Sequence, residues 1–438
     1  MQTAICDIET VTLPNASVEK PSAWNHSDVW IISAALVTLF LKLGIAYNTF
    51  GTNDTVTFYS FARSLSEHGL EWTYRRGVVW LSSSSLFNHP PLTAYFLRAI
   101  HWLARHESLR TSGFTFPFLL RLPGIIADFG VVLLLLSIVK AQPESRRSRW
   151  ALALFALSPV SIMVSGFHGN TDPVMVFFLV AACYMATRQQ PSLCGLFFAL
   201  SCQVKVVPLL LFPIFFFFWW NRRQIVSFLL PTALVFVALW SEPLLNFPSL
   251  FVKNVLSYGS FWGIWGITYW LRLTGLSAFR DVWYEGFSPA QNVVVIVLKA
   301  VIVTSILVIA WRRRTLPASC FTESIAYAWL IFFVFSPGVC AQYMVWLAPF
   351  ILILSPTLYA WLTFGSSLFL FFFYNVTAHG LPWYIAISTN QLNTVWTPWT
   401  IWPWAVLVAG LVILWKKAGE TNPSLRLFSL EAVTADAD

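Results

Sequence analysis

Long apolar segments alternate with short polar breaks along most of the chain. The apolar runs fall at about 29–50, 118–139, 151–167, 172–187, 192–204, 206–220, 224–241, 291–311, 321–337, 342–355, 357–374 and 400–415. About 20 apolar residues in a helix cross the hydrocarbon core of a bilayer. Several runs are shorter, and pairs such as 192–204 with 206–220 also fit broken or re-entrant helices. The pattern predicts an all-α, polytopic transmembrane helical bundle of about 10–13 spans.

Basic residues cluster at the ends of certain runs. The clusters are Lys140 with Arg146, Arg147 and Arg149; Arg222 with Arg223; Arg312 to Arg314; and Lys416 with Lys417. The short breaks 168–173, 336–342 and 375–399 contain no Lys or Arg. Because cytoplasmic loops are enriched in Lys and Arg, both termini are predicted to be cytoplasmic, with these breaks on the translocated side.

This topology gives one transmembrane domain over 1–438. It has a cytoplasmic segment 1–28, a cytoplasmic tail 418–438 and two large translocated-side loops, 51–117 and 242–290. Both loops mix aromatic and basic residues with apolar ones, which is typical of amphipathic helices at the membrane interface. The run 92–106 also fits a buried helix that covers the bundle, and both interpretations remain open.

The composition excludes a soluble protein. Hydrophobic residues make up 57% of the 438 residues and charged residues only 11%, whereas soluble domains carry about a quarter charged residues. The net charge of +8 does not indicate nucleic-acid binding, because the basic residues lie at the ends of the spans.

One acid stands immediately after the first apolar run. Asp54 is thereby placed at the water–lipid boundary, where a carboxylate stays ionised and can reach a lipid-borne headgroup. It is a candidate catalytic base. The alternative is a helix N-cap, because Asn53-Asp54-Thr55 precedes an amphipathic run, and the two roles are compatible.

Three further charged residues lie within or beside apolar runs. Arg121 and Asp128 are seven residues apart, so they share a helix face and fit an internal ion pair, made directly or through another helix. Arg121 also fits a phosphate contact, since guanidinium binds phosphate in bidentate fashion. Lys205 fits either snorkelling at a span end or an anionic headgroup contact.

Three breaks add polar or aromatic candidates. The turn 165–173 holds His168 and Asp172, which fit either a capped hairpin or a sugar or phosphate site, and their spacing is not a metal motif. The Trp- and Gly-rich run 258–270 holds Trp265 and fits an interfacial belt or a sugar contact. The break 336–346 offers Gln342 and Tyr343.

The ordered set of these motifs resembles the GT-C superfamily of integral-membrane glycosyltransferases. The set comprises Asp54, His89-Pro90-Pro91-Leu92-Thr93-Ala94-Tyr95, Arg121-Leu122-Pro123, Ala127-Asp128, Ser158-Pro159, Gly169-Asn170-Thr171-Asp172, Lys205, the Trp-Gly run and Gln342-Tyr343. The likeness is to bacterial polyprenyl-phosphate mannosyltransferase-type members and to dolichol-dependent enzymes. Many relatives have Tyr or Asp before the Pro-Pro pair, where this chain has His89.

The resemblance implies transfer of a hexose, mannose by likeness, from a polyprenyl- or dolichyl-phosphate donor to a glycan, glycolipid or protein acceptor. Asp54 would be the base of an inverting displacement. The donor phosphate and sugar would be held by Lys205, Arg121, His89, His168, Asp172, Trp265, Gln342 and Tyr343. No cofactor or metal is implied, and the active side has no Asp-x-Asp.

The membrane would be a bacterial inner membrane, or the ER membrane in a eukaryote, with the site on the periplasmic, extracellular or luminal side. The alternative function is a transporter or flippase for a sugar or lipid-linked sugar, because many spans and intramembrane charges also characterise transporters.

Overall fold

The computed structural model describes residues 26–80, 83–140, 146–257, 261–280, 287–388 and 399–421. Within these ranges nearly all regular structure is helical, and the strands form just two two-stranded sheets. The predicted terminal segments 1–28 and 418–438 lie almost entirely outside the described residues.

Seven helices in the described part are long and apolar enough to span a membrane. They are α1 (His26–Asn48), α5 (Phe116–Lys140), the run Ser148–His168 through α6, α7 and η1, α11 (Ile225–Asn246), α15 (Pro289–Arg312), the run Ala318–Phe335 of η4 and α16, and α18 (Pro356–Thr377). Shorter apolar helices are α8 (Asp172–Thr187), α9 (Pro191–Val204), the run Val207–Asn221 of η2 and α10, the run Ala341–Leu354 of η5 and α17, and most of α20 (Ile401–Thr421). Each predicted apolar run coincides with one of these helices, which confirms an all-α polytopic bundle.

Several spans are built from consecutive shorter pieces. Their bounds are α6 (Arg146–Ala156), α7 (Pro159–Ser161), η1 (Ile162–His168), η2 (Val207–Leu211), α10 (Phe212–Asn221), η4 (Ala318–Cys320), α16 (Phe321–Phe335), η5 (Ala341–Tyr343) and α17 (Met344–Leu354). The piece η1 is a π-helix. Such helices are rare in proteins, and those that occur are often found at functional sites.

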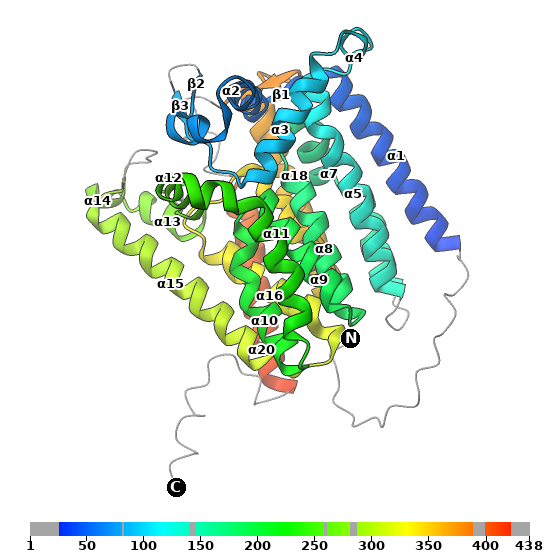
Figure 1. Cartoon of the computed structure of the whole chain (residues 1–438). Coiled ribbons are helices and arrows are strands. Elements are labelled where there is room, and N and C mark those ends of the chain that lie inside the picture. The colour runs from blue at the N-terminus through cyan, green and yellow to red at the C-terminus, as the bar shows by residue number, and fades with distance from the viewer. Residues whose placement is uncertain are drawn as a thin grey trace.

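The remaining elements cover one end of the bundle, the upper one in Figure 1. They are β1 (Gly51–Thr52), α2 (Asn53–Arg76), β2 (Val78–Trp80), β3 (Ser83–Ser85), α3 (Pro91–Ala104), α4 (Glu107–Thr111), α12 (Pro248–Phe251), η3 (Val252–Leu256), α13 (Gly266–Leu273), α14 (Ser277–Arg280) and β4 (Ile385–Ala386). We call this the α2/α3 end. The helices and strands described within the predicted loops 51–117 and 242–290 lie there (Figure 1).

The α2/α3 end has a hydrophobic core of its own. Phe58 and Phe61 of α2 and Leu97 of α3 pack with Trp240 of α11 and Phe251 of α12. This cluster is separate from the main core, which is shared by the spans. Burial of these large side chains fixes α2 and α3 on top of the bundle.

Helix α3 has one buried and one exposed face. Leu97 and Ile100 are buried, whereas Tyr95 and Trp102 are exposed. The run 92–106 therefore has features of both interpretations. Its inner face covers the bundle, as a buried helix would, and its outer face is exposed, as in an interfacial amphipathic helix.

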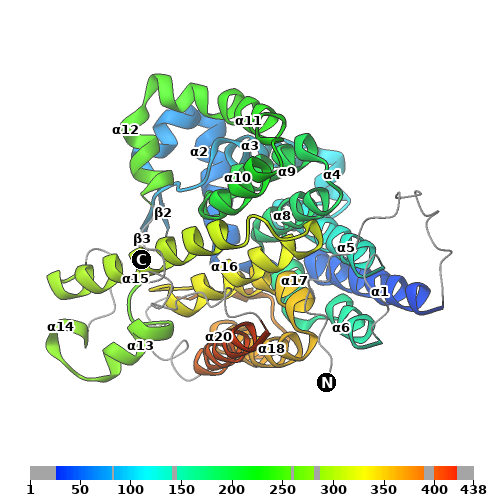
Figure 2. The same ribbon diagram turned by 90° about the horizontal axis from the view of Figure 1, so that it is seen from below.

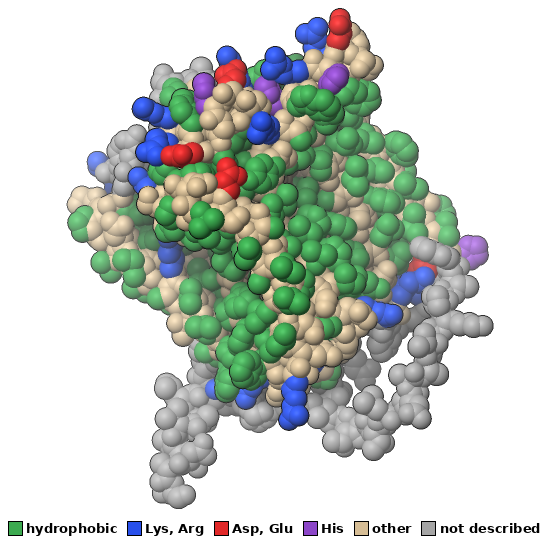
Figure 3. Space-filling model, in the orientation of Figure 1, with side chains coloured by type: hydrophobic (Ala, Val, Ile, Leu, Met, Phe, Trp, Pro, Cys, Tyr) green, Lys and Arg blue, Asp and Glu red, His purple; other side chains and the backbone are tan. Residues whose placement is uncertain are grey.

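Basic side chains lie at both ends of the molecule in Figure 3, and some of them lie at the lower end, the one that faces the viewer in Figure 2. Arg222, which follows α10, donates to the carbonyl oxygens of Arg314 at 3.3 Å and Leu316 at 2.7 Å. Lys140, at the end of α5, pairs with Asp28 of α1 at 2.7 Å. The basic clusters after α5, α10 and α15 thus share one end, as the sequence predicts.

The buried charges of α5 pair differently from the prediction. Asp128 accepts from Lys42 of α1 at 2.8 Å and from Ser161 at 2.5 Å, and it also accepts from Ser165. Arg121 contacts none of these groups; its partners are backbone carbonyls described below. The Arg121–Asp128 ion pair, one of the two interpretations of these residues, is thus not made, because a closer helix, α1, supplies a lysine at the level of Asp128.

Candidate active site

Asp54 lies in the first turn of α2, directly after the short strand β1. The Thr52 hydroxyl, not a carboxylate, caps the helix by accepting the Asp54 N–H at 3.3 Å. Gly51 has φ +104°, and a Cβ there would come within 2.8 Å of the Phe167 carbonyl oxygen. The N-cap interpretation of Asp54 is thus wrong, and its side chain is free of that role.

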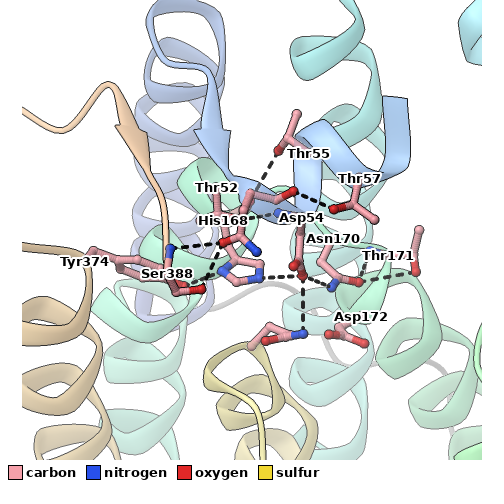
Figure 4. A network of polar contacts seen from close by, with 12 residues as sticks. Thr52, Asp54, Thr55, Thr57, His168, Asn170, Thr171, Asp172, Tyr374 and Ser388 are labelled. Carbon is pink, nitrogen blue, oxygen red and sulfur yellow. Dashed lines mark hydrogen bonds and ion pairs between the residues drawn. The ribbon is translucent and has the colours of Figure 1, made fainter. Parts of the chain in front are cut away.

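The Asp54 carboxylate receives several hydrogen bonds on one oxygen (Figure 4). Oδ2 accepts from His168 Nε2 at 3.0 Å, from Asn170 Nδ2 at 3.0 Å and from Gln342 Nε2 at 3.5 Å. Among the described residues no hydrogen bond is made to Oδ1. Because the Asp54 side chain is 30% exposed, the second oxygen remains available to a substrate.

His168 is the last residue of the π-helix η1 and stands between Asp54 and Tyr374. Its Nδ1 is 2.8 Å from the Tyr374 hydroxyl of α18. Its two ring nitrogens thus join Asp54 to Tyr374, with Nε2–H donating to the Asp54 carboxylate. The Thr52 hydroxyl donates to the His168 carbonyl at 2.8 Å and ties this turn to the start of α2.

Lys205 is held by one acid and two aromatic rings. It follows α9 in an extended conformation, and its Nζ lies 2.5 Å from Asp172 Oδ1. The same Nζ lies 4.8 Å from the ring centroid of Tyr343 and 5.2 Å from that of Trp346. Aromatic faces stabilise an ammonium that has left water, so the side chain is fixed in a buried place.

Asp54 and Lys205 face a common cavity of about 270 Å³. Other polar residues lining it are Asn53, Thr57, Ser85, Asn88, His89, Asn170, Gln342 and Tyr343. Phe58, Phe61, Val206, Val207 and Phe261 supply apolar wall. The cavity therefore joins α2, the segment before α3, the start of η2 and the turn before α17.

Electrostatics hold Asp54 in its ionised form. Burial raises the pKa of its carboxyl, but the His168 hydrogen bond, the charges of His168 and Lys205 and the Asn170 hydrogen bond together lower that pKa below its usual value. Burial and the nearby Lys205 charge lower the pKa of His89 to about 3. At neutral pH the cavity thus presents a carboxylate, an ammonium and a neutral imidazole.

The predicted site residues fall into three groups. Asp54, His89, Lys205, Gln342 and Tyr343 line the cavity. His168 and Asp172 stand behind it, one bonded to Asp54 and the other to Lys205. Arg121 and Trp265 do not line it.

Arg121 is buried among backbone carbonyls at the end of α1. Its side chain donates to the carbonyl oxygens of Pro117 at 2.9 Å, Ala46 at 2.8 Å and Gly166 at 3.1 Å, and to Thr49 Oγ1 at 2.8 Å and Thr49 O at 2.5 Å. A guanidinium carries five N–H donors, so these contacts occupy all of them. Arg121 ties the end of α1 to η1 and leaves no N–H for a phosphate.

Trp265 is completely buried, and its Nε1 donates to the Phe333 carbonyl of α16 at 2.7 Å. It anchors the start of α13 on the bundle. Phe261, four residues earlier, reaches the cavity instead.

Asn170 and Tyr374 were not among the predicted site residues. Asn170 stands in the same polar turn as His168, so the turn gave a signal, but an amide carries no charge that would single it out. Tyr374 ends an apolar run, where a lone tyrosine is ordinary. Its contact with His168 spans 206 positions and depends on how α18 packs against η1.

Within the described residues, no group of three or more His, Cys, Asp or Glu side chains is placed to hold a metal ion. The arrangement around Asp54 is built from hydrogen-bond donors and a lysine.

A carboxylate and an ammonium that share a cavity at one end of a membrane-length helical bundle fit the class of membrane glycosyltransferases. The sequence model of glycosyltransferase family 87 matches residues 87–337, more than half of the chain. The chain belongs to this family and is a multi-pass membrane glycosyltransferase, which agrees with the GT-C resemblance. No curated protein matches it.

Family membership favours the glycosyltransferase over the transporter or flippase alternative. The match covers His89, Arg121, His168, Asp172, Lys205 and Trp265 but ends before Gln342, and Asp54 precedes it.

Proposed function

We propose that this glycosyltransferase moves a hexose, mannose by resemblance, from a polyprenyl-phosphate donor to an acceptor hydroxyl with inversion, using Asp54 as the base. The observation that carries the proposal is the pairing of one ionised carboxylate with one fixed ammonium across a single cavity. The donor carries a phosphate and the acceptor must lose a proton, so the two groups match the two needs of the reaction.

In the proposed step the acceptor oxygen attacks the anomeric carbon while its proton passes to Asp54. The bond from that carbon to the phosphate oxygen breaks, and its electron pair leaves with polyprenyl phosphate. Oδ1 takes the proton, since Oδ2 is already held by His168 and Asn170. The leaving phosphate is a weak base, so no general acid is needed.

Lys205 stabilises the charge that develops on the departing phosphate. One N–H of its ammonium faces Asp172 at 2.5 Å, and the residue also lines the cavity, so its other donors serve the phosphate. His89, neutral at physiological pH, contributes an N–H hydrogen bond rather than charge. Gln342 and Tyr343 contact the sugar or its phosphate.

The reaction takes place on the translocated side in this proposal. In this proposal the basic clusters after α5, α10 and α15 face the cytoplasm, and the Asp54 cavity lies at the opposite end, because α2 and the segment before α3 line it. The membrane is then a bacterial inner membrane or an ER membrane, and the acceptor a glycan, glycolipid or protein.

The test compares Asp54→Asn with the wild type. Membranes containing each protein receive polyprenyl-phosphate mannose labelled in the sugar, and label in glycolipid, glycan and protein fractions is counted. We expect wild-type membranes to transfer label and Asp54→Asn to lose about 10²–10⁴-fold of the rate, the range for a general base.

Glu67→Gln is the matched control, because Glu67 is an exposed acid on the same helix, 13 positions further along. Transfer by Glu67→Gln should equal wild type. Full transfer by a folded Asp54→Asn protein would exclude Asp54 as the base. Transfer only from a nucleotide sugar would exclude the polyprenyl-phosphate donor.

A further inference from the structure

A second cavity lies on the other side of the α2–α3 pair. It has a volume of about 470 Å³ and is open to the surface. Its walls come from Ser66 of α2, from the outer face of α3 and from the start of α4. It shares no lining residue with the Asp54 cavity, so it is not part of the site described above.

The cavity is rich in cationic side chains. Arg98 and Arg105 of α3 stand two helical turns apart and flank His101, and His106 lies at the rim. One carboxylate, Glu107, also lines the cavity. No ion pair is made by Arg98 or Arg105 within the described ranges.

Two arginines of α2 at this end are neutralised locally. Arg63 pairs with Glu67 at 2.8 Å and Arg75 with Glu71 at 2.6 Å, each pair one turn apart on α2. Arg98 and Arg105 lack such an acid on α3, so their guanidinium groups keep their donors for a ligand. Guanidinium favours phosphate because its N–H groups match two phosphate oxygens.

The inner wall of this cavity is formed by a side chain that is held in place, His101. His101 is only 5% exposed, and its Nδ1 is 3.0 Å from Ser66 Oγ. The Ser66 hydroxyl donates to the Ala62 carbonyl at 2.8 Å, and the Tyr59 ring packs edge-on against His101. Since the serine proton is used, the imidazole must donate to the serine oxygen, and the ring orientation is set.

The cavity lies near the predicted membrane surface. Trp102, between the two arginines on α3, is 62% exposed, and the exposed Tyr47 stands near the end of α1. The Tyr47 hydroxyl donates to the Ser112 carbonyl at 3.3 Å, four residues before α5 begins. Exposed aromatic and basic side chains beside span ends are typical of the headgroup level of a bilayer.

We propose that the cavity bounded by Arg98, His101, Trp102 and Arg105 binds the phosphodiester headgroup of an anionic membrane phospholipid. The two guanidinium groups contact the phosphate, and Trp102 lies against the glycerol and upper acyl region. A bound lipid here braces α3 against the bundle on the side away from the Asp54 cavity. This site is independent of the proposed donor and acceptor.

The test measures lipid binding by the full-length protein in detergent. Phosphatidylglycerol and phosphatidylcholine are titrated, and bound lipid is counted by native mass spectrometry. The charge-removing variant is Arg98→Gln with Arg105→Gln. The control is Arg75→Gln with Arg76→Gln, which removes the same charge from exposed positions at the same end.

We expect the wild type and the control to retain phosphatidylglycerol in preference to phosphatidylcholine. The Arg98→Gln/Arg105→Gln variant should bind phosphatidylglycerol about thirtyfold more weakly, the effect of two basic residues at a membrane surface. Arg98→Lys with Arg105→Lys keeps the charge and a similar length, so it should bind with intermediate strength. This variant also keeps the test decisive if the glutamine variant does not fold.

Three results would overturn the proposal. Equal loss in the control variant would assign the effect to general surface charge, and equal retention of phosphatidylcholine would remove the preference for anionic lipid. Competition by millimolar inorganic phosphate as effective as that by phosphatidylglycerol would make this a soluble-anion site. Glycosyl transfer in detergent should persist in Arg98→Gln/Arg105→Gln, so this outcome is separate from the Asp54 test.

Discussion

Two buried Lys–Asp pairs in this protein have the same chemistry and different surroundings. Lys42 and Asp128 meet at 2.8 Å between α1 and α5, and Ser161 accepts a hydrogen bond from Lys42 and donates one to Asp128. Lys205 and Asp172 meet at 2.5 Å beside the Asp54 cavity. The cavity at the first pair measures only about 10 Å³, whereas the one at the second measures about 270 Å³.

The difference distinguishes a closed pair from one that borders a cavity. Serine hydroxyl groups hydrogen-bond to the Lys42–Asp128 pair, so both charges are compensated inside the bundle. Lys205 has a single acid and two ring faces, and it also lines the larger cavity. A buried charge in a membrane span is therefore not by itself a functional site; the space beside it decides.

Breaking the closed pair should have the largest effect. Lys42→Ala leaves Asp128 without its cation in the bundle, and we expect a loss of about 3–5 kcal/mol of unfolding free energy, as for other buried pairs broken on one side. The measurement is thermal or denaturant unfolding in detergent. Lys42→Met with Asp128→Leu removes both charges and should recover most of the stability; no recovery would show that the pair itself is indispensable.

Neutralising both members of each pair sharpens the comparison. Lys205→Gln with Asp172→Asn should fold but lose about 10²–10³-fold in transfer rate, the usual effect of removing one group that stabilises developing charge. Lys42→Gln with Asp128→Asn should keep transfer within a few-fold of wild type. Rates are measured with labelled polyprenyl-phosphate mannose. Equal loss of transfer in both double variants would erase the distinction drawn here.

The smallest effect should come from the contacts behind Asp54. In His168→Ala the burial that raises the pKa of Asp54 remains, while the hydrogen bond and charge that lower it are lost. That pKa rises, so the acid limb of kcat/KM against pH should move to higher pH. Lys205 and His89, which also face Asp54, are unchanged.

Tyr374→Phe is a second variant that should change the same pH profile by a smaller amount than His168→Ala. Tyr374 reaches Asp54 only through His168, so the limb should move in the same direction by less. A rate reduced equally at every pH, with no movement of the limb in either variant, would mean that His168 and Tyr374 only support the fold.

The hydrophobic pattern alone located the spans well. Each apolar run became a helix, because in a bilayer a segment must satisfy its own backbone hydrogen bonds and a helix does so with local contacts. The basic ends of α5, α10 and α15 were likewise placed together from sequence. The run 206–220 matches the observed run Val207–Asn221 to within one residue, but its division into η2 and α10 beside Pro208 and Pro213 was not predicted.

The sequence did not predict which polar side chains contact each other. Asp54 stood out because it follows a span, and His168 because it stands in a polar turn. Lys42 lies inside the first apolar run and was not predicted as a partner of any acid. The spacing of Arg121 and Asp128 on one helix suggested an ion pair between them. The actual partners of Asp128 lie 86 and 33 positions away, on other elements.

Sequence by itself thus determined the class of the protein, the helices and the end at which chemistry was to be sought. Tertiary structure decided which charges close on each other and which face a cavity. The physical reason is that periodicity shows which face of a helix is apolar, whereas a buried ion pair depends on which helix packs opposite and on the space left between them.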